Sequence, residues 1–299
     1  MNRKLCLLLL SPIILTSAGC NTNGESGAKK VDVIIISGQS NAVGCTYSEY
    51  IEDTYKYGEY QKGYSNIQIA YDCWTKDWPA SGITFYSQNT SKNNDFVKVK
   101  LGQGNSINTF GPEIGIAEAM HEKYGDKLFL IKFACGGSNL KDDWLGSSSP
   151  MYGRMIDYIK LQMENLKKKG YAPTIKAFCW MQGEGDSYYG YYQSYRDNLR
   201  TFINDVRDDL RSLAGDKDIP FIDAGISDAS EWEYYRQVNN AKKLVADEND
   251  NNFYIDTIAA GLHTDKEPLF KVDVCHYDSE SEIQLGHLFA EYFEPFLDK

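Results

Sequence analysis

The sequence has no apolar run long enough to cross a membrane. Its longest, from Leu5 to Leu15, is about half of the roughly 20 residues that a membrane-spanning helix needs. Basic residues are also in deficit, because 31 Lys and Arg stand against 42 Asp and Glu, for a net charge of −11. Such a balance repels phosphate backbones and anionic headgroups. We therefore expect neither a polytopic membrane protein nor a nucleic-acid partner.

Metal-binding patterns are missing as well. The chain has four His and no Cys-x-x-Cys pair, so we expect no zinc site. Of the 7 Cys, Cys6 and Cys20 lie in the first twenty residues, and the odd number left in the mature domain cannot pair completely. Cys45 and Cys73 are the pair considered for a disulfide. Three Cys are expected to be buried free thiols: Cys135, Cys179 and Cys275.

The N-terminus has the parts of a secretory signal peptide. Arg3 and Lys4 precede the apolar run, and the small residues 17–19 precede Cys20. This end resembles the lipobox of bacterial lipoproteins, although Ser17 stands where that motif usually carries an aliphatic residue. We predict a signal peptide over 1–19, a lipidated Cys20 and a polar tether to residue 30, with simple secretion as the alternative. The protein would then be exported and anchored to a membrane, in the periplasm or at the cell surface.

Short apolar runs alternate with helical patterns along the rest of the chain. Five runs predict strands: 31–37, 127–135, 174–181, 219–224 and 252–256. Five segments predict helices: 112–120, 151–169, 191–213, 232–247 and 282–296. This order is typical of a five-stranded parallel sheet with helices on both faces, here an α/β domain over 31–299.

The alternation fails between Cys45 and Phe110, where aromatic residues are spread among polar ones and glycines. A structureless loop of that length is uncommon unless it is functional. We expect an insertion that forms a small lid or wall beside the site and could include a hairpin. The alternative is a surface addition packed on the sheet edge. The 22 Tyr and 5 Trp of the chain suit stacking on sugars.

Polar residues concentrate in four segments that follow strands: 37–44, 135–140, 180–186 and 273–278. In parallel sheets, ligands bind at the carboxyl ends of the strands. Acyl transfer needs an activated hydroxyl, an oriented base and donors for the oxyanion. Ser40 lies on a strand-to-helix turn, and Asp273 lies three residues before His276, where its carboxylate can reach one imidazole nitrogen. The Gly-x-Ser-x-Gly motif of α/β-hydrolases is absent.

Two other residues compete for these roles. His263 also follows a strand, but its nearest acid in sequence, Asp265, has a poorer spacing than Asp273 has to His276. Ser138 is the alternative nucleophile, although the two glycines before it suit a loop of backbone donors better.

The four segments together resemble the blocks of SGNH hydrolases: Gly38-Gln39-Ser40-Asn41, Gly136-Gly137-Ser138, Gln182-Gly183-Glu184 with Asp186, and Asp273-x-x-His276. Most closely they resemble the branch with carbohydrate esterase family six and the sialate O-acetylesterase-like domains. The similarity runs from about residue 31 to residue 296. It implies a flavodoxin-like three-layer α/β/α fold and removal of O-acetyl groups from carbohydrate without metal or cofactor.

The resemblance also implies a role for each block. Ser40 would be the nucleophile, His276 the general base and acid, and Asp273 its orienting carboxylate. The oxyanion would be held by the backbone N–H groups of Ser40 and Gly137, with Gly136 as the alternative, and by the side-chain amide of Gln182. Four further residues are expected to support the site through hydrogen bonds: Gln39, Asn41, Glu184 and Asp186.

The sequence thus predicts a serine esterase that deacetylates an oligo- or polysaccharide through an acetyl-serine intermediate, of the acetylxylan esterase or sialate O-acetylesterase type. One alternative is a serine esterase for non-carbohydrate esters. Another is a glycan-binding lipoprotein that lost the chemistry. Neither the particular glycan nor the oligomeric state is predicted.

Overall fold

The computed structural model describes residues 27–77, 80, 82–124, 127–267 and 273–298. The signal peptide, Cys20 and most of the tether lie outside these residues, so those predictions stay predictions. Within the described part of the chain, no helix is both long enough and apolar enough to span a bilayer.

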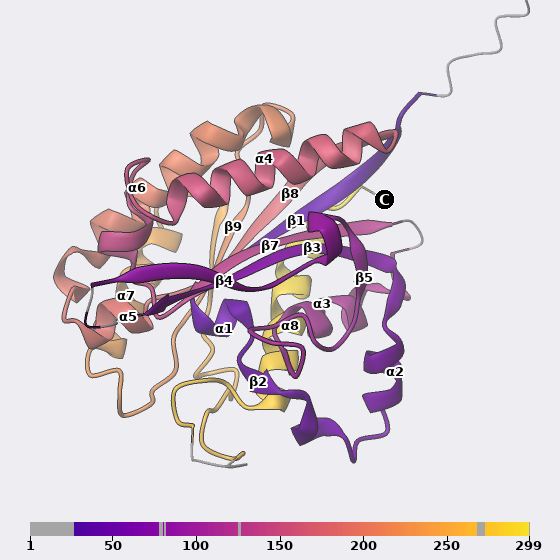
Figure 1. The fold of residues 1–299 in the computed structure, drawn as a ribbon. Coiled ribbons are helices and arrows are strands. Elements are labelled where there is room, and N and C mark those ends of the chain that lie inside the picture. Colours follow the sequence, from indigo (N-terminus) through magenta and orange to yellow (C-terminus); the bar gives the residue numbers. More distant parts are fainter. Residues whose placement is uncertain (1–26, 78–79, 81, 125–126, 268–272, 299) are drawn as a thin grey trace, which may run out of the picture.

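An eight-stranded sheet forms the centre of the described structure (Figure 1). Six strands run parallel, in the order β10 (Asn252–Ile255), β9 (Phe221–Ala224), β8 (Tyr171–Met181), β1 (Lys29–Gly38), β7 (Leu128–Gly136) and β3 (Tyr64–Asp77). Two more, β4 (Thr84–Thr90) and β5 (Val97–Val99), pair antiparallel with β3. All five predicted strands are present, but the predicted count of five was too low because β3, from the insertion, adds a sixth parallel strand.

β1 lies in the middle of the sheet, between β7 and β8. Its residues Val33 to Ile36 are completely buried, as expected of a parallel strand covered on both faces. The strand begins at Lys29 and pairs there with Tyr171. The last two residues of the predicted tether therefore belong to the sheet, so the domain begins slightly earlier than predicted.

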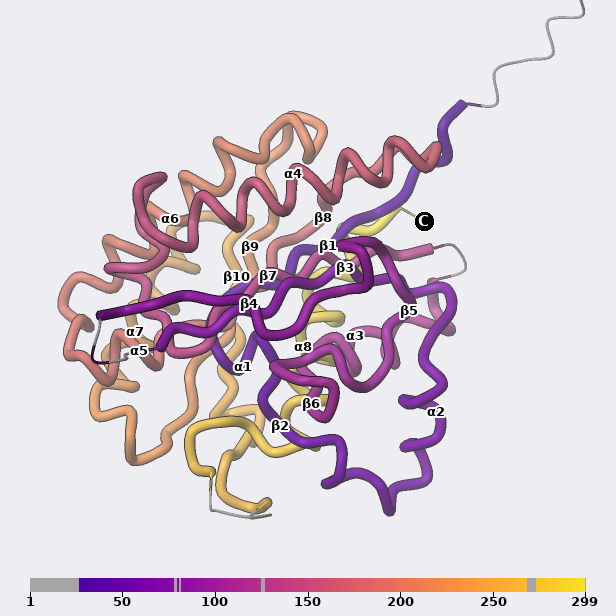
Figure 2. The backbone as a smooth tube through the Cα atoms, viewed as in Figure 1, coloured from indigo at the N-terminus to yellow at the C-terminus, as the bar shows by residue number. Residues whose placement is uncertain are grey.

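Helices cover both faces of the sheet, which confirms the three-layer α/β/α architecture (Figures 1 and 2). On one face, α3 (Glu113–Met120) packs against α8 (Ser279–Phe293). On the other, α4 (Tyr152–Lys168) packs on β7 and β8 and contacts α6 (Tyr192–Leu210). α7 (Tyr235–Ala246) packs against α6 and β10.

The aromatic-rich insertion is mainly an extension of the sheet. β3 pairs with β7 along nine residues and makes a hairpin with β4, while α2 (Tyr57–Lys62) lies before β3. Ile67, Ile69 and Cys73 of β3 are fully buried. Most of the insertion therefore fits the alternative prediction, an addition packed on the sheet edge. Only the end of β3 fits the prediction of a wall beside the site.

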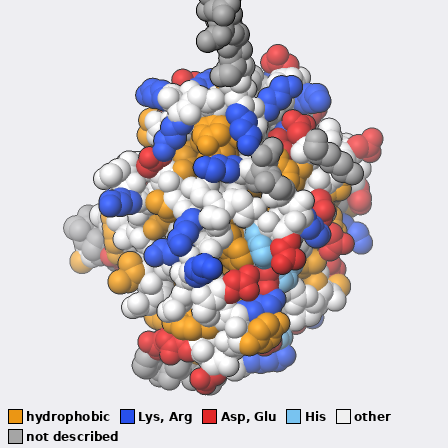
Figure 3. Space-filling view, turned by 90° about the vertical axis from the view of Figure 1, so that its right-hand side faces the viewer, with side chains coloured by type: hydrophobic (Ala, Val, Ile, Leu, Met, Phe, Trp, Pro, Cys, Tyr) orange, Lys and Arg blue, Asp and Glu red, His pale blue; other side chains and the backbone are white. Residues whose placement is uncertain are grey.

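The ends of the insertion come together in a small antiparallel pair of β2 (Thr46–Tyr47) and β6 (Thr109–Phe110). In Figure 2 the loop that precedes α8 lies beside β2. The face shown in Figure 3 carries acidic and basic side chains interspersed, with apolar side chains in small groups. No field of a single sign dominates that face.

Candidate active site

Ser40 lies on a sharp turn at the carboxyl end of β1. Gly38 has a φ of +139°, and a Cβ at this position would lie 1.9 Å from the backbone oxygen of Met181. Only glycine fits there. The four-residue helix α1 (Ser40–Val43) follows. Its first residue, Ser40, is partly exposed, while Gln39 before it and Asn41 after it are buried. The turn thus leaves the serine accessible and buries the residues on either side of it.

Ser40 lines a cavity of about 540 Å³ together with Gly136, Gly137 and His276. These residues come from three of the four polar segments, so the structure brings the predicted nucleophile, donor loop and base to one place. A Cβ at Gly136 would lie 3.9 Å from Cβ of Ser40. The end of β7 therefore lies directly against the serine.

Asp273 and His276 form the pair that their spacing predicts. Nδ1 of His276 lies 2.7 Å from Oδ2 of Asp273, whose Oδ1 accepts hydrogen bonds from the backbone N–H groups of Cys275 and His276 at 2.9 and 3.2 Å. Burial raises the pKa of Asp273, but the hydrogen bond and charge of His276 outweigh it and lower that pKa to about 2. The carboxylate is therefore ionised and fixes one nitrogen of the imidazole.

Cys45 is a neighbour of the imidazole that the sequence reasoning did not assign to the site. Cys45 and His276 line the same cavity. Burial lowers the pKa of His276, but Cys45 and Asp273 outweigh burial and hold the pKa well above its usual value. Among the described residues no hydrogen bond joins Ser40 to His276, a bond that often tightens only when substrate binds.

The pairing of Cys45 with Cys73 is not formed. Both are free thiols, and Cys73 is completely buried, with Sγ facing the backbone oxygens of Val43 and Gln103. Cys135 and Cys179 are buried free thiols as expected, whereas Cys275 is only half-buried and lines the cavity.

Two backbone N–H groups beside the serine are available for an oxyanion. Those of Ser40 and Gly137 have no hydrogen-bond acceptor in the described part of the chain. Ser40 is the first residue of a helix, where N–H groups have no partner within the helix. Gly137 follows β7 with a φ of +73°, whereas Gly136 is the last residue of that strand. This favours Gly137 over Gly136 as the donor.

Gln182 does not lie where the prediction put it. Its side chain is fully buried, and Nε2 donates to Oε1 of Gln39 at 3.2 Å and to Oδ2 of Asp186 at 2.7 Å. Oε1 accepts from the hydroxyl of Tyr195 at 3.1 Å. Both amide hydrogens are therefore committed, and Gln182 is not among the cavity-lining residues. In this geometry it supports Gln39 and Asp186 rather than an oxyanion.

Gln39 and Asn41, on either side of Ser40, connect the turn to the segment after β8. Oε1 of Gln39 accepts from the N–H groups of Gly183 and Gly185 at 3.2 and 3.1 Å. Nδ2 of Asn41 donates to Oε1 of Glu184 at 2.8 Å, and burial raises the pKa of that carboxyl. These contacts match the supporting roles expected of Gln39, Asn41 and Glu184.

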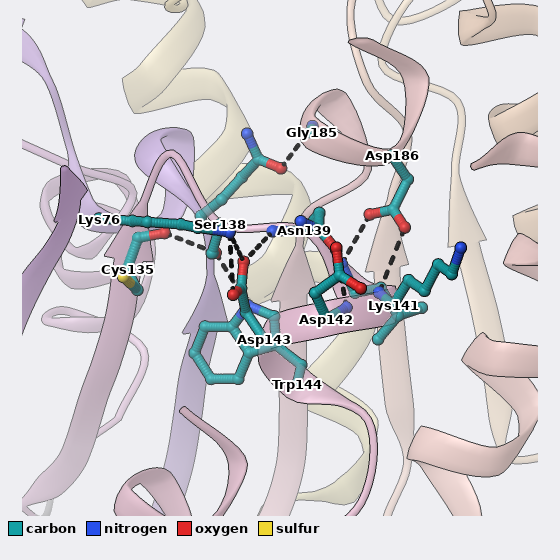
Figure 4. Close-up of polar contacts among 12 residues, drawn as sticks. Lys76, Cys135, Ser138, Asn139, Lys141, Asp142, Asp143, Trp144, Gly185 and Asp186 are labelled. Atoms are coloured by element: carbon teal, nitrogen blue, oxygen red, sulfur yellow. Dashed lines mark hydrogen bonds and ion pairs between the residues drawn. The ribbon is translucent and has the colours of Figure 1, made fainter. Parts of the chain in front are cut away.

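Asp186 holds the loop that follows β7 (Figure 4). Its Oδ2 accepts from the backbone N–H of Leu140 at 2.7 Å, and burial raises its pKa to about 6. In the same loop, the hydroxyl of Ser138 donates to the backbone oxygen of Cys135 at 2.7 Å and accepts from Nε1 of Trp144 at 2.8 Å. Ser138 is fully buried and braces the loop, which disfavours it as the nucleophile.

His263 does not take part in the same cavity. Nδ1 of His263 lies 2.7 Å from Oδ2 of Asp278, an acid that the sequence reasoning did not pair with it. His263, Asp265 and Asp278 offer ligand atoms within 4.8 Å of one another, the sole such group in the described residues. None of these three residues lines the cavity that holds Ser40.

A family of carbohydrate esterases, described as sialic acid-specific acetylesterases, matches residues 30–294. The chain belongs to this family. No curated protein matches the sequence. Among solved structures, a protein from Arabidopsis thaliana is similar with 24% identity and a TM-score of 0.59, over 89% of this chain and 99% of that one.

Two further solved structures share the fold of this carbohydrate esterase. One is the protein named NanS, with 14% identity and a TM-score of 0.56 over 91% of this chain and 98% of that one. The other is described as a carbohydrate acetylesterase from Xanthomonas citri, with 15% identity and a TM-score of 0.51 over 87% of this chain and 54% of that one.

The esterase has cavity-lining residues that the sequence reasoning did not single out. The end of β3 contributes Trp74 and Thr75, and the segment before β6 contributes Asn105. Tyr188 is the last residue of α5 (Glu184–Tyr188), Tyr189 follows it, and Trp232 lies before α7. Tyr188, Tyr189 and Trp232 could have been found in the sequence as aromatic residues that stand shortly after a predicted strand.

Proposed function

We propose that this carbohydrate esterase is a serine O-acetylesterase with Ser40 as nucleophile, His276 as general base and acid, and Asp273 as the carboxylate that orients the imidazole. The proposal rests on one arrangement. A partly exposed serine, a histidine held by an ionised aspartate and two backbone N–H groups without acceptors meet at a single cavity, which the serine and the histidine line. These are the three components that acyl transfer requires.

In the first half of the reaction, the neutral imidazole of His276 takes the proton of the Ser40 hydroxyl while Oγ forms a bond to the acetyl carbon. The N–H groups of Ser40 and Gly137 hold the oxyanion. The C–O bond to the sugar breaks, and the imidazolium returns its proton to the sugar oxygen. Water then attacks the acetyl-serine with His276 as base, releasing acetate and restoring Ser40.

The charges around the site favour a neutral sugar over a sialic acid. A second cavity of about 440 Å³ shares His276 with the first and is lined by the carboxylates of Glu231, Glu267, Asp273 and Asp278. In the first cavity the described lining has one Lys and no Arg, and this residue, Lys76, forms an ion pair of 2.7 Å with Asp143. A sialic acid carboxylate would meet repulsion here, so we propose acetylated neutral sugars such as xylan as substrates.

Acetate release from three substrates tests this proposal. The purified protein is given acetylated xylan, O-acetylated sialic acid and 4-nitrophenyl acetate, with Ser40→Ala as the inactive control. We expect release from xylan and from the aryl ester, and none from the variant. Preferential release from sialic acid would contradict the neutral-sugar assignment, and release from the aryl ester alone would contradict the carbohydrate assignment.

We also propose that the enzyme is exported and lipidated at Cys20, on the basis of residues 1–20 alone. Metabolic labelling with an alkyne fatty acid should mark the wild-type protein and not Cys20→Ser. An unlabelled wild-type protein in the medium would instead indicate simple secretion.

A further inference from the structure

A ridge of tyrosines leads away from the cavity that holds Ser40. The ridge consists of Tyr188, the last residue of α5, and Tyr189 and Tyr191 in the connection to α6. Tyr188 and Tyr189 line the cavity and are 63% and 40% exposed. The ridge is thus continuous with the site and reaches beyond it.

The rings of the ridge are ordered relative to one another. The Tyr188 and Tyr189 centroids are 5.2 Å apart at an interplanar angle of 87°, and Tyr189 and Tyr191 are 5.9 Å apart at 30°. Nζ of Lys141 lies 4.1 Å from the centroid of the Tyr191 ring. Contacts between the rings hold them as a surface, which reduces the side-chain entropy lost when a ligand binds.

Exposed aromatic surface next to a cavity is a mark of a binding site, because soluble proteins otherwise keep such patches small. Tyr and Trp offer a flat apolar face with a polar edge, which matches the alternating C–H faces and hydroxyl edges of a sugar ring. The cavity itself, at about 540 Å³, is of the size that takes a small ligand. A glycan chain with its acetylated unit at Ser40 must therefore continue outside the cavity.

We propose that the ridge binds the flanking units of an acetylated polysaccharide, so that the enzyme prefers a polymer to an acetylated monosaccharide. This inference rests on the proposed function. The ring of Tyr188, the most exposed of the three, stacks on a sugar unit next to the one being deacetylated. Tyr191, whose ring lies against Nζ of Lys141 and packs on Tyr189, supports the ridge. The stacking contributes when that neighbouring unit is present.

The test compares kcat/KM for acetate release from acetylated xylan with that from acetylated xylose. The double variant Tyr188→Ala/Tyr191→Ala should lower the polymer-to-monosaccharide ratio about tenfold, the effect expected for about 1.4 kcal/mol of lost stacking. Tyr188→Phe/Tyr191→Phe keeps the rings and should preserve most of the ratio. Tyr55→Ala is the matched control, because Tyr55 is 92% exposed and lies outside both cavities.

A second measurement separates binding from chemistry. The Ser40→Ala protein should be depleted from solution by insoluble acetylated xylan, and less so once both tyrosines are alanine. An unchanged ratio in the alanine variant, or equal rates on polymer and monosaccharide in the wild type, would overturn the inference alone. Release from the aryl ester without release from either sugar would overturn the proposed function and this inference with it.

Discussion

The two halves of the active site are built differently. The half with Ser40 and Gly137 lies at the ends of two adjacent parallel strands, and the residues around it, such as Gln39 and Ser138, are buried and hydrogen-bonded. The half with Asp273 and His276 lies on a loop before α8, where the two side chains are 46% and 28% exposed.

The difference teaches which part of the chemistry the fold fixes in advance. Donors for an oxyanion stabilise it best when they need no reorganisation, and the sheet ends provide this rigidity. The base approaches from a loop, the usual place for residues positioned by a rigid scaffold. One buried side chain, Asn41, joins the halves, because its Oδ1 accepts from the backbone N–H of Tyr277 at 3.1 Å while its Nδ2 binds Glu184.

The largest loss of activity should follow a substitution in the rigid half of the site, which contains Ser40 and Gly137. Ser40→Ala removes the nucleophile, and the loss of a triad serine costs about 10⁶-fold in kcat. Because Ser40 is partly exposed, the variant should keep its thermal midpoint. Acetate release and circular dichroism measure the two quantities.

Ser138→Ala is the matched control for that variant. It removes the bonds to Cys135 and Trp144, so the free energy of unfolding should fall by about 1–3 kcal/mol while turnover remains measurable. Complete loss of activity in folded Ser138→Ala, with activity kept in Ser40→Ala, would exchange the two roles.

The next effect should come from the loop. Asp273→Asn leaves the imidazole without its ionised partner and allows the wrong tautomer, a change that can cost about 10⁴-fold in kcat. Since Asp273 is nearly half exposed, stability should change little. Steady-state kinetics with 4-nitrophenyl acetate measures the loss, and a decrease of less than tenfold would argue against Asp273 as the orienting group.

The features that the sequence predicted are local ones. Strands such as β1 and β7 are continuous apolar runs, and the contact of Asp273 with His276 follows from a spacing of three residues. β3 was missed because its apolar residues alternate with polar ones among many aromatics, so its strand period was not distinguished from a loop. Alternation of this kind acquires meaning only when a neighbouring strand, here β7, is present to pair with it.

Contacts distant in sequence were beyond the same reasoning. The direction of the Gln182 amide depends on Gln39, Asp186 and Tyr195 together, and the approach of Cys45 to His276 depends on where the insertion meets the loop before α8. A sequence motif specifies which residue type stands at a position. The direction of that residue's side chain depends on the residues packed around it.

A smaller loss of activity is expected when Asn41, the side chain that joins the two halves of the site, is replaced. Asn41→Ala leaves the Tyr277 N–H and the buried carboxyl of Glu184 without this partner, which should cost about 1–3 kcal/mol in unfolding free energy. The loop should also lose its alignment, so kcat should fall more than KM rises. Chemical denaturation and kinetics test both parts. A stable variant with normal kcat would show that the halves are held together in another way.

The smallest expected effect is a shift in the pH at which His276, in the loop half of the site, becomes neutral and the enzyme becomes active. Catalysis needs a neutral imidazole, and Asp273 and Cys45 raise the pKa of His276 well above its usual value. The imidazole thus stays protonated to higher pH, and kcat/KM should fall as pH drops through that raised pKa. Cys45→Ala removes one raising group, so the acid limb should move to lower pH. Cys275→Ser is the control, because it replaces another thiol that lines the same cavity. If the acid limb of the kcat/KM profile stays at the same pH in Cys45→Ala, Asp273 alone raises the pKa of His276. Cys45, shortly after α1, would then have no electrostatic influence on the imidazole.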